Sequence, residues 1–301
     1  MFRPTSDGWL SILRIGLSLQ VIFYCCSLRK DWNALFQAYG EGLISRDLAE
    51  AILNAQSGLL PRLGWLTQLG DKIGLGENFV LSAVWLLLFS AATFLLIGLF
   101  SRVAAAVTWF LFLSASKSGN LMTYGMDNFT MIGLFYLMVS PLPDSRALDY
   151  KVWKQRPRDQ RALGFFQRVL QIHLCVIYFS SGLAKSLGSG WWNGLSMWRA
   201  LTSPPFDSIS PDVLARLTCL LLFLGVSVCV LELGYPVFIW QKRAGLIWLS
   251  SVLVMHITIG FTMRLYLFAL IMIVLNLAAF GTRFFTITDV GTDLEVPIPS
   301  T

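Results

Sequence analysis

The sequence predicts an all-α integral membrane protein built as a polytopic bundle of about eight transmembrane helices. Hydrophobic residues make up 55% of its 301 residues and charged residues only 13%, whereas soluble domains carry about 25% charged residues. Each crossing of a hydrocarbon core about 30 Å thick needs about 20 apolar residues, so eight crossings use roughly 160 residues and leave roughly 140. This excludes a large soluble domain. The sequence also lacks the ten-residue segments of alternating hydrophobicity that are typical of an outer-membrane barrel.

Eight apolar segments carry the predicted crossings. Their bounds are 9–28, 79–100, 102–116, 127–141, 164–186, 213–240, 245–263 and 266–281. The first segment is too long for the apolar core of a signal peptide and lacks a small-residue cleavage site, so we expect a retained helix. Gly98 to Arg102 predict a tight turn between the second and third segments.

The longest connection joins the first two segments. Residues of about 33–77 form an amphipathic extramembrane segment, and within it residues 43–56 predict a short helix that lies on the membrane surface. We find no repeat and no second domain. The predicted organisation is therefore a transmembrane bundle over 1–282 and a C-terminal tail over 283–301.

Positive charges predict the orientation of the bundle. If the N-terminus is cytoplasmic, that side carries 11 Lys and Arg residues, and the short loops of the opposite side carry three. Cytoplasmic loops are enriched in Lys and Arg, so we expect both termini in the cytoplasm. The same residues explain the net charge of +6. Membrane lipid, rather than nucleic acid, is therefore the expected partner.

The fifth segment carries the most informative polar residues. A polar stripe about 100° wide follows one face of this helix and contains Arg168, Gln171, Cys175, Tyr178, Gly182 and Lys185. Such a stripe faces protein or water. Lys185, beside Trp191 and Trp192, has two open interpretations: a snorkelling lysine in an aromatic belt, or a base. An amine that apolar surroundings keep neutral can take a proton from a substrate.

Two further ionisable side chains lie inside apolar segments, where their cost makes each a functional candidate. We expect Glu232 to be protonated, paired with a cation such as Arg168, or part of a proton path. His256 is either catalytic or held by an interhelical hydrogen bond. Asp127 and Asn128 begin the fourth segment, where N-capping accounts for at least one of them. The five cysteines lie in apolar runs, and no cluster has the spacing of metal ligands, so no metal is predicted.

The fifth segment also resembles a known family. Residues 178–185, followed by 191–197, resemble the Y-F-x-x-G-x-x-K…W-x-x-G-x-S-M signature of vitamin K-dependent gamma-glutamyl carboxylases and the related horizontally transferred transmembrane (HTTM) proteins. The spacing from Glu232 to His256 fits the family pattern without a gap. The opening motif Leu13-Arg14-Ile15-Gly16 and the turn from Gly98 to Arg102 are similar to bacterial members of the sporulation-delaying protein B type. The resemblance covers most of residues 9–280 and implies a multi-pass protein of the bacterial inner membrane.

The resemblance implies an outward-facing active site. In the carboxylases a lysine base deprotonates a reduced naphthoquinone, oxygen adds, and the resulting strong base removes a proton from the γ-carbon of a glutamate that then takes up carbon dioxide. The resemblance implies a reduced, vitamin K-like quinone as cofactor. The catalytic residues that it implies are Lys185, His256 and Glu232, and the substrate-binding residues are Tyr178, Gly182, Trp191, Trp192 and Asn128.

The chain departs from the carboxylases at two points. Asn128 or Phe129 aligns with the family's catalytic histidine, and neither can act as an acid or a base. Only about 20 residues follow the last predicted helix, whereas the carboxylases carry a large extramembrane domain for their peptide substrates.

Two classes of function therefore stay open. The first is an HTTM-type membrane enzyme that binds a quinol or another lipophilic substrate, with Lys185 as base. The alternative is a non-enzymatic membrane subunit that assembles with, or matures, a secreted peptide or a redox or membrane-protein partner. A small-molecule transporter is less favoured, because no matched pair of interrupted helices marks a midplane site. DoxX-type quinone-linked proteins are an alternative family of the same broad class.

Overall fold

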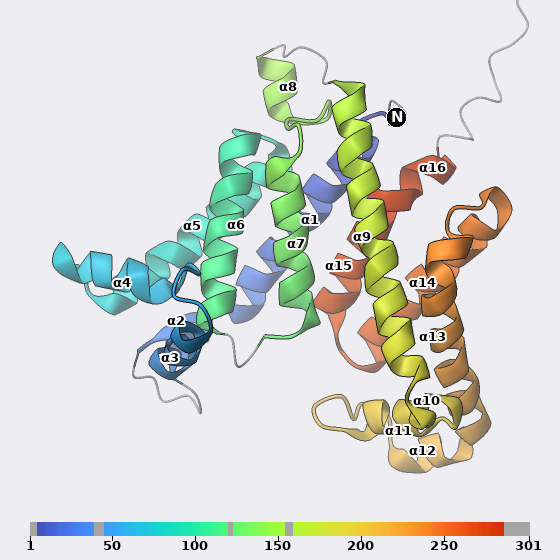
Figure 1. Ribbon diagram of the computed structural model, residues 1–301. Helices are drawn as coiled ribbons and strands as arrows, with labels where there is room; N and C mark the ends of the chain where they lie inside the picture. The colour runs from blue at the N-terminus through green and yellow to red at the C-terminus, as the bar shows by residue number, and fades with distance from the viewer. Residues whose placement is uncertain (1–4, 39–44, 120–122, 154–158, 286–301) are drawn as a thin grey trace, which may run out of the picture. The chain divides into compact units, whose positions relative to one another are not determined.

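The computed structural model describes residues 5–38, 45–119, 123–153 and 159–285, and within these ranges it contains helices and no strand (Figure 1). Six helical segments are long and apolar enough to cross a membrane: α1 (Gly8–Leu28), α5 (Glu77–Ile97), α9 (Gln160–Ser186), α13 (Thr218–Phe238), α14 (Lys242–Thr262) and Tyr266–Phe284. The prediction of an all-helical protein with several membrane-spanning helices is therefore confirmed, with six such helices rather than eight meeting the criteria of length and apolar composition among the described residues. The other two predicted crossings correspond to α6 (Ser101–Ser118), which carries more polar residues, and α7 (Gly125–Val139), which has 15 residues.

The helices gather into two compact units. The first contains residues 1–166 and 265–274, and the second contains residues 167–264 and 275–301. Most of the predicted C-terminal tail, from residue 286 onward, lies outside the described residues.

In the first unit, α1, α5, α6 and α7 form a closed ring in which each helix packs on the next and α7 packs on α1. The predicted turn between α5 and α6 is confirmed. Gly98 ends α5 with φ +75°, a left-handed conformation that glycine adopts at little cost. The Asp149 carboxylate accepts the backbone N–H groups of Phe100 at 2.8 Å and Ser101 at 2.6 Å, and so caps the start of α6.

A buried ion pair joins α1 to the segment that follows α7. The Arg14 Nε lies 2.5 Å from an Asp144 carboxylate oxygen, and the two side chains are 2% and 0% exposed. Arg14 also donates to the Leu95 carbonyl at 2.9 Å, and the Ser11 hydroxyl donates to Asp144 at 2.6 Å. These hydrogen bonds satisfy charges that would otherwise be costly to bury.

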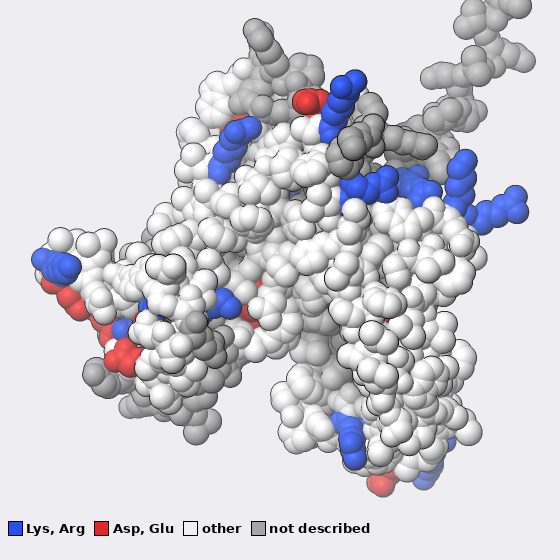
Figure 2. Space-filling model, in the orientation of Figure 1, with Lys and Arg blue, Asp and Glu red and all other residues white. Residues whose placement is uncertain are grey.

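The segment predicted to lie outside the membrane contains three helices, where the sequence predicted one. They are α2 (Trp32–Phe36), α3 (Arg46–Gln56) and α4 (Leu63–Lys72). The predicted helix at 43–56 is confirmed over 46–56, and residues 43 and 44 lie outside the described residues. Ser45 caps α3 by accepting the Leu48 N–H. Charged side chains gather around α3 and α4 and are sparse along the middle of α6 and α7 (Figure 2).

The second unit is built around α9, α13 and α14. After α9 the chain forms the short helices α10 (Ser189–Trp192), α11 (Leu195–Thr202) and α12 (Pro211–Arg216). The predicted segment 213–240 is interrupted at Leu217, because α12 ends before α13 begins. The last segment is also less regular than predicted. It starts as α15 (Tyr266–Asn276), passes through a π-helical turn at Leu277–Gly281 and ends as α16 (Thr282–Phe285).

Candidate functional site

Lys185 and Glu232 form an ion pair in the second unit. Lys185 lies in the last turn of α9, and its Nζ is 2.6 Å from Oε2 and 2.9 Å from Oε1 of Glu232 on α13. The same Nζ donates to the Ser181 hydroxyl at 2.5 Å. The glutamate side chain is 8% exposed and the lysine side chain 24%. The pair is therefore mostly buried, and the lysine is the more exposed of the two partners.

Arg168 is not the partner of Glu232, which corrects one of the predicted pairings. Its guanidinium lies over the Trp240 ring, 4.7 Å from the ring centroid. The polar stripe of α9 does face protein, as predicted, since Gln171 and Tyr178 are buried. Lys185 can reach the carboxylate because α9 packs closely on α13 near its C-terminal end, at a glycine one turn before the lysine.

That glycine is Gly182. A Cβ atom added to it would lie 2.8 Å from the Leu233 backbone nitrogen and 2.9 Å from the Glu232 Cβ. These distances are shorter than ordinary van der Waals contacts, so only glycine lets α9 and α13 come this close. Gly182 therefore sets the geometry of the ion pair by bringing the two backbones together.

Two tryptophans stand beside the pair. The Lys185 Nζ lies 5.6 Å from the centroid of the Trp191 ring, within the range of a cation–π interaction. Trp192 donates from its indole nitrogen to the Ser186 carbonyl at 2.7 Å, which ties α10 to the end of α9. A Cβ at Gly225 would lie 2.5 Å from the Trp191 carbonyl oxygen, so α10 rests directly on α13. The site thus has an aromatic wall next to its charged pair.

A second polar cluster joins four buried side chains, and we call it the tyrosine–histidine network. The Tyr178 hydroxyl is 2.8 Å from the His256 Nε2 and accepts a hydrogen bond from the Asn276 amide at 2.8 Å. The Tyr235 hydroxyl donates to the Asn276 side-chain oxygen at 2.7 Å. All four side chains belong to residues that are at most 3% exposed. The expected interhelical hydrogen bond of His256 is therefore present.

Asn276 and Tyr235 were not among the predicted site residues. Asn276 is an amide inside the otherwise apolar segment 266–281, so its polarity alone could have marked it. Tyr235 follows Glu232 by three residues on one helix face, but a tyrosine in an apolar helix is common and carries little signal. The rings of Tyr178 and Tyr235 stack with their centroids 4.1 Å apart.

The ion pair and the network occupy the same interface between α9 and α13. Tyr178 and Lys185 lie seven residues apart on the stripe of α9, which is about 10 Å along a helix. Gly182 lies between them. On α13 the partner of Lys185, Glu232, comes before the partner of Tyr178, Tyr235, because the two helices are antiparallel. Five of the predicted residues, with Trp191 and Trp192 beside them, are therefore brought together in the second unit: Lys185, Glu232, His256, Tyr178 and Gly182.

Asn128 is the predicted residue that does not join this cluster. It belongs to the first unit, where its side chain is exposed on α7. Its neighbour Asp127 accepts the Tyr124 N–H at 3.0 Å, so the expected capping role at this helix start falls to Asp127.

The ion pair suits proton transfer. An amine and a carboxylate at hydrogen-bond distance are the kinds of donor and acceptor that acid–base chemistry uses. Among the described residues, no group of three or more His, Cys, Asp and Glu side chains is arranged to hold a metal ion. Comparison of the chain with protein-family models, with curated proteins and with solved structures finds no match.

Proposed function

We propose that the chain is a membrane enzyme of the HTTM and gamma-carboxylase-like type, in which the Lys185–Glu232 pair removes a proton from a hydroxyl group of a lipophilic substrate. The observation that carries this proposal is the pair itself, an amine and a carboxylate that lie 2.6 Å apart and are 24% and 8% exposed. In this scheme Lys185 passes its proton to Glu232 and, as a neutral amine, takes the proton of the substrate hydroxyl. The oxyanion that is left then faces the Lys185 ammonium.

The resident residues fit a reduced quinone. The Trp191 ring beside Nζ offers an aromatic surface for a flat ring, and the pair offers both a donor and an acceptor to a phenolic hydroxyl. A bound quinol would supply reducing equivalents and a weakly acidic hydroxyl. We propose that Tyr178 and His256 hold α9 and α14 in register behind the pair, and that they pass protons between buried groups.

The same proposal includes the topology. We propose eight crossings in a bacterial inner membrane, with α6 and α7 as the two additional ones and both termini cytoplasmic. Lys185, at the C-terminal end of α9, then opens to the outer side. The long first connection lies on that side as well, which suits a protein that meets lipophilic or secreted molecules there.

The experiment uses the purified full chain in nanodiscs, with oxygen-dependent consumption of vitamin K hydroquinone as the readout. Lys185→Arg keeps the positive charge beside Glu232 but cannot lose its proton, so it should fold normally and lose at least 99% of the activity. Lys242→Arg makes the same change at an exposed position at the start of α14 and should leave the activity unchanged.

The same experiment distinguishes the proposed enzyme from the alternative of a non-enzymatic subunit. Full activity of Lys185→Arg would overturn the proposed role of the amine. A wild-type protein that consumes no hydroquinone, retains no quinone on mass spectrometry and purifies in mild detergent with a stoichiometric partner would instead support the subunit.

A further inference from the structure

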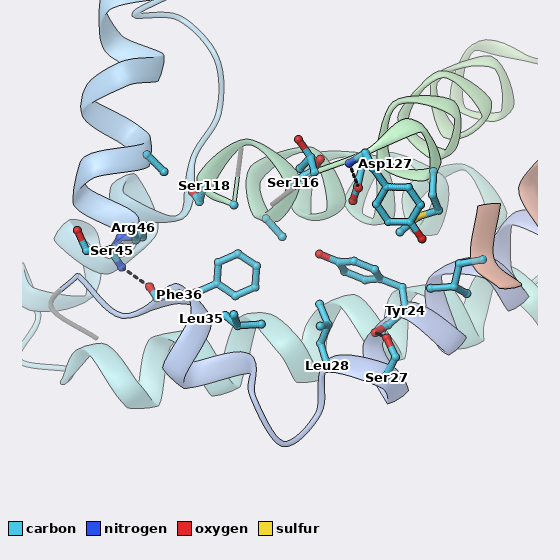
Figure 3. A pocket seen from close by; sticks show the side chains of 17 residues that line it. Tyr24, Ser27, Leu28, Leu35, Phe36, Ser45, Arg46, Ser116, Ser118 and Asp127 are labelled. Carbon is cyan, nitrogen blue, oxygen red and sulfur yellow. Dashed lines mark hydrogen bonds between the residues drawn. The ribbon is translucent and has the colours of Figure 1, made fainter. Parts of the chain in front are cut away.

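The first unit contains a cavity of about 250 Å³ that the proposed function does not use. It lies among the C-terminal end of α1, helix α2, the start of α3, the end of α6 and the start of α7. Figure 3 shows the rings of Tyr24 and Phe36 on either side of the open space, with the Tyr24 hydroxyl pointing into it. Tyr124 adds a third aromatic residue to the lining.

Two of the buried polar residues that line this cavity, Asp127 and Ser116, indicate what it could bind. Asp127 is 4% exposed, and its carboxylate accepts the Tyr124 N–H. In the described part of the chain no Lys or Arg nitrogen lies within 4 Å of that carboxylate. Ser116 is 2% exposed, and its hydroxyl has no hydrogen-bond partner among the same residues. A buried hydroxyl without a partner is costly, so it points to a missing ligand group.

The charges around the cavity favour a cation. Arg46 also lines it, but three carboxylates surround this guanidinium: Glu77 at 2.6 Å, Asp47 at 3.6 Å and Glu50 at 3.7 Å. The three carboxylates outnumber the one guanidinium, so this cluster carries an excess of negative charge. Lys117, in the last turn of α6, forms no ion pair with Asp127. An anionic ligand would have to overcome this field.

We propose that this cavity binds a protonated primary amine with a small apolar body. The ammonium would donate hydrogen bonds to the Asp127 carboxylate and to the Ser116 hydroxyl, and the aromatic walls would hold the carbon body and add cation–π attraction. The N–H donors distinguish this ligand from a quaternary ammonium, which carries the charge but can donate a hydrogen bond to neither group. The amine can come from a free small molecule or from the headgroup of phosphatidylethanolamine.

The test is a calorimetric titration of the purified full chain with 2-phenylethylammonium. Two uncharged or N–H-free analogues, 2-phenylethanol and N,N,N-trimethyl-2-phenylethylammonium, should bind the wild type at least tenfold more weakly. Equal binding of the alcohol and the ammonium would overturn the proposal without any substitution.

Three variants place the binding in the cavity. Asp127→Asn keeps an oxygen that can accept the Tyr124 N–H but loses the charge, and should weaken binding at least tenfold. Ser116→Ala should weaken it about threefold. Asp71→Asn, an exposed acid on α4 in the same unit, should change nothing. Unchanged binding in Asp127→Asn would overturn the proposal, and melting curves show that each variant is folded.

Native mass spectrometry distinguishes the two sources of the amine. Retention of phosphatidylethanolamine by the wild type, with its loss in Asp127→Asn and no retention of phosphatidylcholine, supports the lipid headgroup. Binding of 2-phenylethylammonium without lipid retention supports a free amine. Binding of neither overturns the proposal.

Discussion

Glu232 has a counter-charge only because Lys185 reaches it from another helix. Neither residue has a second ion-pair partner among the described residues. A buried charge that loses its partner is costly, whereas an ion pair replaced by apolar residues of similar volume is often neutral for stability. The two residues should therefore be tightly coupled in stability as well as in chemistry.

We expect Lys185→Met to lower the free energy of unfolding by about 3 kcal/mol, the low end for removing one partner of a buried pair, since the lysine side chain is 24% exposed. The double variant Lys185→Met/Glu232→Met should regain most of this stability but none of the proposed hydroquinone activity. Thermal unfolding in detergent checks both. Equal melting temperatures for the single and double variants would show that the two side chains are not coupled.

At the scale of the elements, the close approach of α9 and α13 is the main determinant of the site. We expect Gly182→Ala to separate the two helices, because its Cβ would lie under 3 Å from the α13 backbone, which cannot move as a flexible side chain can. The Lys185–Glu232 distance should grow and the protein should lose about 1–3 kcal/mol of stability. Gly58→Ala, where nothing lies within 4 Å of the new Cβ, should cost little. Unfolding curves for the two variants test this difference.

The sequence was informative about which residues matter and less so about their partners. Lys185, Glu232 and His256 are recognisable one by one, because polar groups inside apolar helices are rare. Their contacts cannot be recognised in the same way. The partners of Lys185 and Tyr178 lie 47 and 78 residues away, and which side chains meet depends on how each helix is rotated about its axis. Periodicity placed the long apolar helices well. It missed α2 and α4, and it missed the break at Leu217, since short helices carry too few turns for a clear pattern.

For the whole molecule, the number of crossings decides where the loop between α6 and α7 lies. Eight crossings place it outside, and six place it in the cytoplasm, while α9 has the same orientation in both. We expect Thr123→Cys, with the exposed Cys26 and Cys219 changed to Ser, to react in intact cells with a maleimide that cannot cross the membrane. Labelling only after the cells are permeabilised would support six crossings. Ser145→Cys, at the predicted cytoplasmic side, is the matched control.

The Arg14–Asp144 pair has a consequence for how the protein is made. The two residues are 130 positions apart, so at about 5–20 residues per second the ribosome adds Asp144 roughly 7–26 s after Arg14. During that interval α1 carries a cation whose carboxylate has not yet been synthesised. The first helix therefore enters the membrane before its ion-pair partner exists, and the pair can form only after α7 and the residues that follow it have been translated.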